Sequence, residues 1–442
     1  MAWPTVEMEE VTAASYGCSM FRQEKPTLQI LAFEAAKNMS VLVSLYKSLT
    51  HDEFLKLRNG PMKSPGVAFL NSTDETYLLG LACKEKLEDL NHIASVVSRL
   101  SKRCVDEELS RFETAYQNMK HGTTIDISNL DFNSKKAGKI IEKMETYASA
   151  TSSLYTAMED LKKLELYEKR KQRSRTNEKI CFQRKHVRHL KQVSLWNKTF
   201  DKIVALMARI ICTVYARICV VFEPFVPSLL STTTVTTANC FSFRRLYVSH
   251  LKAFHMKKNN KQKASKSSPI LSGVTMNNKS SNIKTNVNQR LIQSAPPNTV
   301  GAAGLTARYA NIIVMTETYF YSTALITDAA RKHMFEILPV NLKQTLRGKL
   351  RSHWYKVERE GKGLEEGWKE ALEEIIRWLA PVAHDTLIWQ QERNLEQQKL
   401  VAKPTVLLFQ TLHFSDLEKT EAAIVELLVG LSCIYWYENR RR

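Results

Sequence analysis

Residues that break helices are scarce in this chain, and no other feature constrains its fold as strongly. Only 14 glycines and 12 prolines occur among 442 residues, whereas a β-sandwich or a barrel needs frequent turns. Apolar residues recur at steps of three and four, and no segment alternates apolar and polar residues as a half-buried strand does. The sequence therefore predicts an all-α protein with almost no β-strand.

Length and composition divide the chain into modules. A chain of 442 residues is too long for one ordinary core, so two or three modules are expected. We predict two helical modules joined by a long basic coiled-coil-like helix and a disordered linker. The predicted parts are a disordered tail (1–26), an N-terminal helical domain (27–125), the coiled-coil-like basic helix with an amphipathic helix (131–223), a Ser/Thr/Asn/Lys-rich disordered linker (228–297) and a C-terminal helical domain (299–438).

The net charge of +19 is concentrated in the middle of the chain. Residues 1–160 carry a net charge of −4 and residues 291–442 a net charge of +1, whereas residues 161–290 carry +22. This asymmetry indicates an acidic partner of the middle segment or a targeting signal within it. Lys252 to Arg290 holds nine basic and no acidic residues, and such self-repulsion with little apolar content predicts disorder.

A coiled-coil-like seam lies just before the basic segment. Its positions are separated by alternating steps of four and three residues, over about three heptads. Because three heptads are near the lower limit for a coiled coil, an intramolecular helical hairpin is favoured over pairing with another chain, and the oligomeric state stays open. The seam consists of Ile140, Met144, Tyr147, Thr151, Leu154, Met158 and Leu161.

The most specific charge feature is a short basic run. The seam helix is expected to continue as a basic helix from Lys162 to Lys191, with 12 Lys or Arg against 3 Glu. Five of the seven residues from 169 to 175 are basic, which suits a nuclear import signal or a polyanion-binding face. A solvated helix face is the alternative interpretation. The candidate residues are Lys169, Arg170, Lys171, Arg173 and Arg175.

No group of residues predicts catalysis, a cofactor or a metal. Gly301 and Gly304 lack the Lys-Ser/Thr and the preceding strand of a phosphate loop, so we interpret them as small residues that let helices pack closely. His186 and His189 could form half of a metal site, but no cysteine or carboxylate of suitable spacing joins them. The His-Asp pair at 384–385 has no candidate nucleophile nearby in sequence. We expect a protein that is not an enzyme and that works by binding partners.

No segment predicts secretion or a membrane span. The longest apolar run, Ile203 to Leu230, contains Arg209, Arg217 and Glu223, and a charged residue at bilayer depth costs about 2.5–3.5 kcal/mol. The chain begins with neither a signal peptide nor the Met-Gly of an N-myristoylation signal. We expect an intracellular protein of the nucleus, the cytoplasm or both, with peripheral attachment to the plasma membrane left open.

The last module should be a helical bundle, with helices at 302–321, 328–338, 341–354, 364–379, 382–399 and 416–437. The final helix carries a continuous apolar stripe, which would be an aggregation hazard if it were exposed. We expect it to pack against the helices at 302–321 and 364–399. Four tryptophans could form a ligand cage, but core packing is favoured because aromatic rings bury large areas and share a helical face with apolar neighbours. They are Trp354, Trp368, Trp378 and Trp389.

Several short strings of the sequence are specific enough to identify a family. They are ILAFEAA (30–36), DETYLLGLAC (74–83), VSRLSKRC (97–104), SLWNKTFD (194–201), ARICVVF (216–222), RYANIIV (308–314), WLAPVAH (378–384), WQQERN (389–394) and KTEAAIVELLVG (419–430). These strings resemble the N-terminal domain, the central helix and the C-terminal domain of the plant PSK SIMULATOR family. Both family domains are of unknown function.

The resemblance implies a role in promoting plant growth, linked to phytosulfokine peptide signalling. Our first hypothesis for the mechanism is a helical signalling adaptor or scaffold. The resemblance carries over no catalytic residue, and the adaptor hypothesis implies protein partners whose identity the sequence does not give. Two alternatives would use the charge of residues 161–290 instead. One is a peripheral membrane protein on anionic lipid, gaining about 1 kcal/mol per basic residue near the surface. The other is a nucleic-acid-associated nuclear regulator.

Overall fold

Helices dominate the structure. A computed structural model describes residues 26–120, 134–171, 175–224, 295–322, 327–357, 363–395 and 405–440. Among these residues the β pairings are two isolated bridges, Thr27 with Thr199 and Thr299 with Asp416, and no strand forms. The predicted all-α fold with two helical modules is therefore confirmed. The predicted tail up to residue 25 and residues 228–294 of the predicted linker lie outside the described residues.

The core of the N-terminal module lies between α1 (Leu31–Ser48), α4 (Glu75–Ser101), α9 (Phe200–Phe222) and the first half of α7 (Ser134–Lys171). α1 packs along α7, and α4 packs along α9. Helix starts follow local signals: Asp74 accepts a hydrogen bond from the Thr76 backbone N–H at the start of α4, which satisfies a donor that the helix leaves free. The smaller elements are α2 (His51–Asn59), η1 (Pro61–Lys63), α3 (Pro65–Leu70), α5 (Glu107–Ser110) and α6 (Phe112–Lys120).

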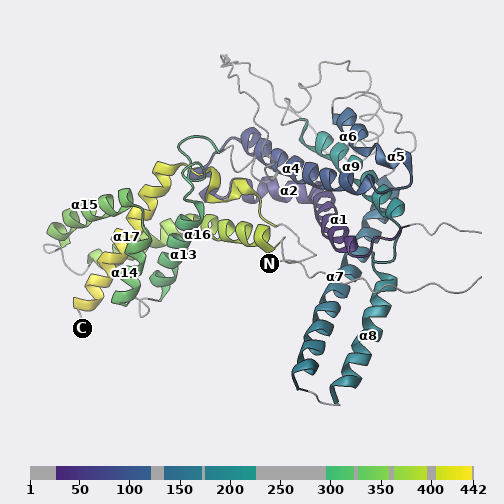
Figure 1. Cartoon of the computed structure of the whole chain (residues 1–442). Helices are drawn as coiled ribbons and strands as arrows, with labels where there is room; N and C mark the ends of the chain where they lie inside the picture. Colours follow the sequence, from purple (N-terminus) through teal and green to yellow (C-terminus); the bar gives the residue numbers. More distant parts are fainter. Residues whose placement is uncertain are drawn as a thin grey trace, which may run out of the picture.

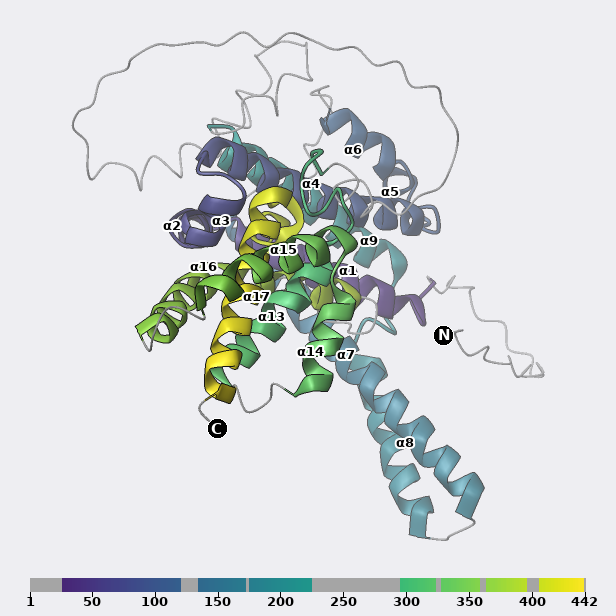
Figure 2. The ribbon, with the colours of Figure 1, turned by 90° about the vertical axis from the view of Figure 1, so that its left-hand side faces the viewer.

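The second half of α7 leaves the body of the module and pairs with α8 (Arg175–Val193) in a hairpin (Figures 1 and 2). We call this hairpin, residues 154–171 and 175–193, the arm. The two helices are antiparallel, because Arg184 of α8 lies 2.8 Å from Glu165 of α7, while Leu195, just after α8, donates its backbone N–H to the hydroxyl of Thr151, earlier in α7, at 3.1 Å. At the base of the arm, a small apolar cluster joins Leu154 and Val187 to Phe33 of α1.

One detail of the sequence prediction is wrong at this point. A continuous basic helix was expected from Lys162 to Lys191, but α7 ends at Lys171 and the chain folds back as α8. The physical reason is that each helix carries its own apolar stripe. By folding back, the two stripes bury one another, which a single projecting helix cannot do.

The C-terminal module packs α16 (Gly363–Leu395) and α17 (Leu417–Arg440) against α13 (Thr306–Tyr321). α15 (Val340–Val357) lies on α17, and α14 (Asp328–Ile337) contacts α13. Two short 3-10 turns, η3 (Leu408–Gln410) and η4 (Leu412–Phe414), precede α17. The final helix is buried against α13 and α16, as its stripe predicts, and Ile424, Leu428 and Leu431 are at most 5% exposed.

Helix α16 runs without interruption through Pro381, although two separate helices were predicted at 364–379 and 382–399. An interior proline removes one backbone hydrogen bond and usually kinks or ends a helix. Here Leu379, Ala380, Val382 and Ala383 are all buried between neighbouring helices. We attribute the continuity of the helix to this packing, since tertiary contacts routinely override local propensity.

Three of the four tryptophans that could have formed a cage pack on the two cores instead. Trp368 and Trp378 contact the C-terminal core, and Trp389 contacts the N-terminal core. The side chain of Trp354 lies outside the described residues.

Two described helices, α9 and the segment Leu417–Tyr437 of α17, are long and apolar enough by composition to cross a membrane. However, 56% of the apolar window of α9 and 61% of that of α17 is buried inside the protein. These residues supply the two cores, and core helices pass the same test of length and composition. The test is therefore weak evidence for a membrane span.

Candidate functional site

The arm presents basic side chains that have no acidic partner. Lys163 pairs with Asp160 at 3.3 Å and Arg184 pairs with Glu165 at 2.8 Å. Five further basic residues of the arm are exposed, and no carboxylate of the described residues lies within ion-pair distance of them. They are Lys162, Lys169, Lys179, Lys185 and Arg188.

Large apolar side chains are exposed on the same hairpin. Phe182 of α8 is 72% exposed, and Leu166 and Tyr167 of α7 are 48% and 47% exposed. Because Glu165 lies opposite Arg184, these three residues stand at the same level of the arm. Aromatic residues together with arginine are enriched at protein–protein interfaces. The arm thus combines exposed apolar contacts with uncompensated positive charge.

The predicted basic run lies at the tip of this arm. Lys169, Arg170 and Lys171 form the end of α7, and Arg175 begins α8. Arg173 lies outside the described residues, as do the side chains of Arg170, Lys171 and Arg175. Lys169 is exposed. The run therefore includes the end of α7 and the start of α8 and does not follow one face of a continuous helix.

The other residues singled out by their chemistry are not brought together. His186 and His189 are exposed on α8, and the described residues hold no group of three or more His, Cys, Asp or Glu side chains suited to a metal ion. His384 lies 2.6 Å from Glu317 on α13, whereas Asp385 accepts a hydrogen bond from Gln410 at 3.4 Å.

The glycine-rich turn at 301–304 is a packing contact. The Gly301 N–H donates to the carbonyl of His413 at 2.9 Å. A Cβ atom at Gly301 would lie 2.4 Å from the His413 ring, closer than any side chain tolerates. This agrees with the interpretation of a small residue that permits close packing at Gly301. At Gly304 the interpretation is wrong, because a Cβ there would meet nothing within 4 Å, and its φ of +68° instead shows a left-handed turn.

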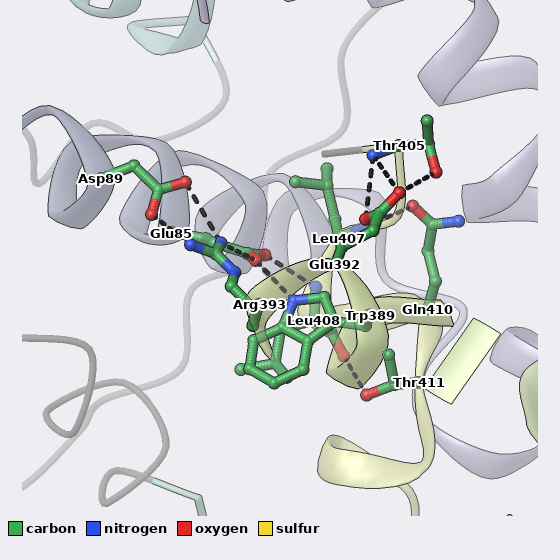
Figure 3. Close-up of polar contacts among 10 residues, drawn as sticks. All are labelled: Glu85, Asp89, Trp389, Glu392, Arg393, Thr405, Leu407, Leu408, Gln410 and Thr411. Carbon is green, nitrogen blue, oxygen red and sulfur yellow. Dashed lines mark hydrogen bonds and ion pairs between the residues drawn. The ribbon is translucent and has the colours of Figure 1, made fainter. Parts of the chain in front are cut away.

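Sequence reasoning missed a buried polar cluster that joins the two modules (Figure 3). Glu85 and Asp89 project from α4, and Trp389 and Arg393 project from α16. Arg393 Nη1 lies 2.7 Å from Asp89, and Arg393 Nη2 lies 3.1 Å from Glu85. Trp389 Nε1 and the backbone N–H of Leu408 also donate to Glu85, at 3.0 and 2.7 Å. We call these five residues the junction.

The junction is largely buried. The side chains of Glu85, Asp89 and Arg393 are 4%, 12% and 15% exposed. Burial raises the pKa of the Glu85 carboxyl, against the attraction of Arg393, which lowers it. Both carboxylates pair with Arg393. The cluster therefore fixes the position of one module on the other. Its sole trace in the sequence is the i, i+4 spacing of the two acids, which any solvated helix shares.

Further contacts tie the modules together beside the junction. The backbone N–H of Asp416 donates to the carbonyl of Leu70 at 2.7 Å. The Asn71 side chain donates to the carbonyl of Phe409 at 3.1 Å. In sequence the arm and the linker separate the two modules, whereas in space the modules touch directly (Figure 1). The arm is thus left free to project from a single body.

Comparison with known proteins covers both modules. Residues 30–86 match the model described as a domain of unknown function (DUF3475), and residues 299–388 match that described as a protein of unknown function (DUF668). Protein PSK SIMULATOR 1 of Arabidopsis thaliana is 24% identical over 429 residues, which cover 91% of this chain. PSK SIMULATOR 3 and PSK SIMULATOR 2 of the same plant are each 23% identical over 91% of the chain. The chain is thus similar to the PSK SIMULATOR proteins over both of its modules.

The aligned region covers 55% of PSK SIMULATOR 1, 56% of PSK SIMULATOR 3 and 58% of PSK SIMULATOR 2. The chain thus spans little more than half the length of these PSK SIMULATOR proteins. The two matched domains correspond to α1 through the first half of α4 and to α13 through most of α16. The names of the PSK SIMULATOR proteins and of their domains give no indication of an enzyme. No solved structure matches the chain.

Proposed function

We propose that the protein is a non-enzymatic signalling adaptor, in which the two docked modules form the body and the arm binds an acidic protein partner. The observation that carries this proposal is the surface of the arm. Five exposed basic residues there lack an acidic partner among the described residues, and Leu166, Tyr167 and Phe182 are exposed at one level. An acidic surface with an apolar patch would neutralise the charge and cover the rings.

We further propose that the adaptor acts in phytosulfokine-related regulation of plant growth. The support is the name shared by the three Arabidopsis relatives. The buried junction supports a scaffold role, because a rigid body can hold a bound partner in a defined orientation.

Proximity labelling in plant cells tests the adaptor proposal. The arm variant carries Lys162→Glu, Lys185→Glu and Arg188→Glu. A matched control, Arg103→Glu with Arg308→Glu and Lys332→Glu, makes the same change in net charge at exposed positions outside the arm. We expect a set of acidic proteins to be labelled by the wild type and the control but lost with the arm variant. Equal labelling by all three proteins would refute a partner site on the arm.

Two binding measurements separate the adaptor from its rivals. Vesicles containing phosphatidylserine and a duplex DNA are each titrated against the wild type, the arm variant and the control. An adaptor should bind both weakly, and the residual binding should fall equally in the two variants, since non-specific attraction follows net charge. If the wild type and the control bind vesicles or DNA tightly and the arm variant does not, the arm binds a membrane or a nucleic acid, and the adaptor proposal is refuted.

We propose that the basic run at the tip of the arm directs nuclear import. Changing Lys169, Arg170, Lys171, Arg173 and Arg175 to Gln should move a fluorescent fusion from the nucleus to the cytoplasm. The triple control described above should leave the distribution unchanged. If the Gln variant is distributed as the wild type is, the basic run is not an import signal and is better interpreted as a solvated helix face.

A further inference from the structure

A cavity of about 830 Å³ lies beside the junction and is walled by both modules. α1, α2, α4 and α7 supply the N-terminal side, and the segment from Thr405 to Gln410 supplies the C-terminal side. Figure 3 shows Thr405, Leu407 and Gln410 next to the junction residues. Pockets for small organic ligands commonly measure about 300–1,000 Å³, so this space is large enough for more than a single ion.

The charged lining of the cavity is not balanced. Lys47 pairs with Glu145 at 2.7 Å, and Lys56 pairs with Glu53 at 2.6 Å. The remaining lysine, Lys86, is only 6% exposed. No carboxylate of the described residues lies within ion-pair distance of its ammonium group, which donates a hydrogen bond to the Ser48 hydroxyl at 2.8 Å. The lining thus carries one positive charge in excess.

A buried ammonium with one neutral partner is unfavourable, since buried charges are normally paired. Burial lowers the pKa of Lys86, although the attraction of Glu85 and Asp89 opposes the shift. These two acids are held on the other side of the cluster by Arg393. Neighbouring positions on a helix point about 100° apart, so Glu85 faces the junction while Lys86 reaches Ser48 on α1.

The rest of the lining suits an organic anion. Ser44 and Ser149 line the space, and the hydroxyl group of each can donate a hydrogen bond to an oxygen atom. Val43 and Leu407 add apolar walls. We propose that this cavity binds a small organic oxyanion, a carboxylate, phosphate or sulfate on an apolar body, with the Lys86 ammonium as its counter-charge.

The position of the cavity gives the ligand a structural effect. Glu392 of α16 accepts hydrogen bonds from the backbone and hydroxyl of Thr405, at 3.0 and 2.5 Å. A bound anion would therefore contact the segment that α16 holds against α4. Because a ligand that binds the folded state stabilises it, occupancy should raise the melting temperature of the docked modules.

The test uses the full chain and four probes: phenyl phosphate, phenylacetate, inorganic phosphate and the neutral 2-phenylethanol. Binding is followed by the shift in melting temperature and by calorimetric titration. We expect both phenyl anions to raise the melting temperature, with no effect of 2-phenylethanol. If inorganic phosphate binds as tightly as phenyl phosphate, the ligand is a bare oxyanion. Tighter binding of the phenyl anions shows that the apolar walls contribute.

Two variants address the site from different sides. Lys86→Met removes the charge and keeps an apolar stem. It should lower the affinity for the phenyl anions by about tenfold or more, as the loss of a charged hydrogen bond does. Ser149→Trp leaves Lys86 in place and fills an exposed part of the lining, so it should abolish binding while the protein stays folded. Lys102→Met, at an exposed lysine outside the cavity, should bind as the wild type does.

Three outcomes would overturn the proposal. The wild type could bind neither anion more tightly than 2-phenylethanol, Lys86→Met could bind as the wild type does, or Ser149→Trp could keep full affinity. Any of these results would show that Lys86 does not bind an anion in the cavity and acts only as a distant counter-charge to Glu85 and Asp89. The arm variant should retain the ligand-induced shift, so this test and the test of the adaptor can fail independently.

Discussion

Removing Arg393 should show how strongly the two modules are joined. Its guanidinium lies 2.7 Å from Asp89 and 3.1 Å from Glu85, and these acids are 12% and 4% exposed. The substitution Arg393→Met keeps most of the apolar stem and removes only the charge. It leaves two carboxylates on adjacent turns of α4 without their ion-pair partner, and both are largely buried.

The expected loss is about 3–5 kcal/mol, the usual effect of breaking a buried ion pair by removing one partner. The upper part of this range is appropriate because a single guanidinium serves both acids. A domain is commonly stable by about 5–15 kcal/mol, so the change is large on that scale. The loss should shrink as the pH falls, since burial raises the pKa of Glu85 and a protonated carboxyl needs no counter-ion.

Urea denaturation followed by circular dichroism measures the free energy of unfolding of each variant. Arg377→Met is the matched control, because Arg377 lies on the same helix, is 74% exposed and reaches Glu373 only at 3.9 Å. Exposed pairs contribute about 0–1 kcal/mol, so the control should stay close to the wild type.

The triple change Glu85→Gln, Asp89→Asn and Arg393→Met tests the cause of the loss. It removes the uncompensated charge, so it should recover part of the stability that Arg393→Met loses. Surface substitutions usually change the free energy of unfolding by no more than about 0.5 kcal/mol. If Arg393→Met changes it by no more than this, the junction does not hold the modules together. Equal losses for Arg393→Met and the triple variant would show that uncompensated charge is not the cause.

Three further predictions concern stability. Leu428 is 5% exposed on α17, so Leu428→Ala should lower the free energy of unfolding by about 2–5 kcal/mol, and a melting curve equal to that of the wild type would contradict its place in the core. Gly66→Ala would place a Cβ 2.3 Å from the Trp378 carbonyl oxygen, whereas a Cβ at Gly80 meets nothing within 4 Å. Gly66→Ala should therefore cost about 1–3 kcal/mol and Gly80→Ala should gain about 0.5–1 kcal/mol in urea denaturation, and opposite signs would refute the packing described. Burial lowers the pKa of His92 below its usual 6.5. As the pH falls below about 6.5, His92 is therefore protonated more readily in the unfolded chain than in the folded one, and the free energy of unfolding decreases. The melting temperature should fall less steeply below that pH in His92→Gln than in the wild type, and parallel curves would exclude His92 as a cause.

Local patterns in the sequence were sufficient to identify most of the helices and the similarity to the PSK SIMULATOR proteins. Helical hydrogen bonds close between residues four apart, so apolar stripes and capping residues such as Asp74 and Thr327 mark helices without knowledge of the rest of the chain. The same patterns were insufficient at two places. The turn between α7 and α8 and the continuity of α16 through Pro381 both depend on which apolar surfaces bury one another.

The junction and the cavity could not be found from the sequence by itself. Glu85, Lys86 and Asp89 have the composition of an ordinary solvated helix face, and nothing beside them in the chain distinguishes them. Trp389 and Arg393, which contact Glu85, lie 304 and 308 residues away. The burial of these charges is therefore decided by the packing of α16 and the 405–410 segment on α4, because the cost of a buried charge depends on how much water neighbouring elements exclude and on the partners they bring.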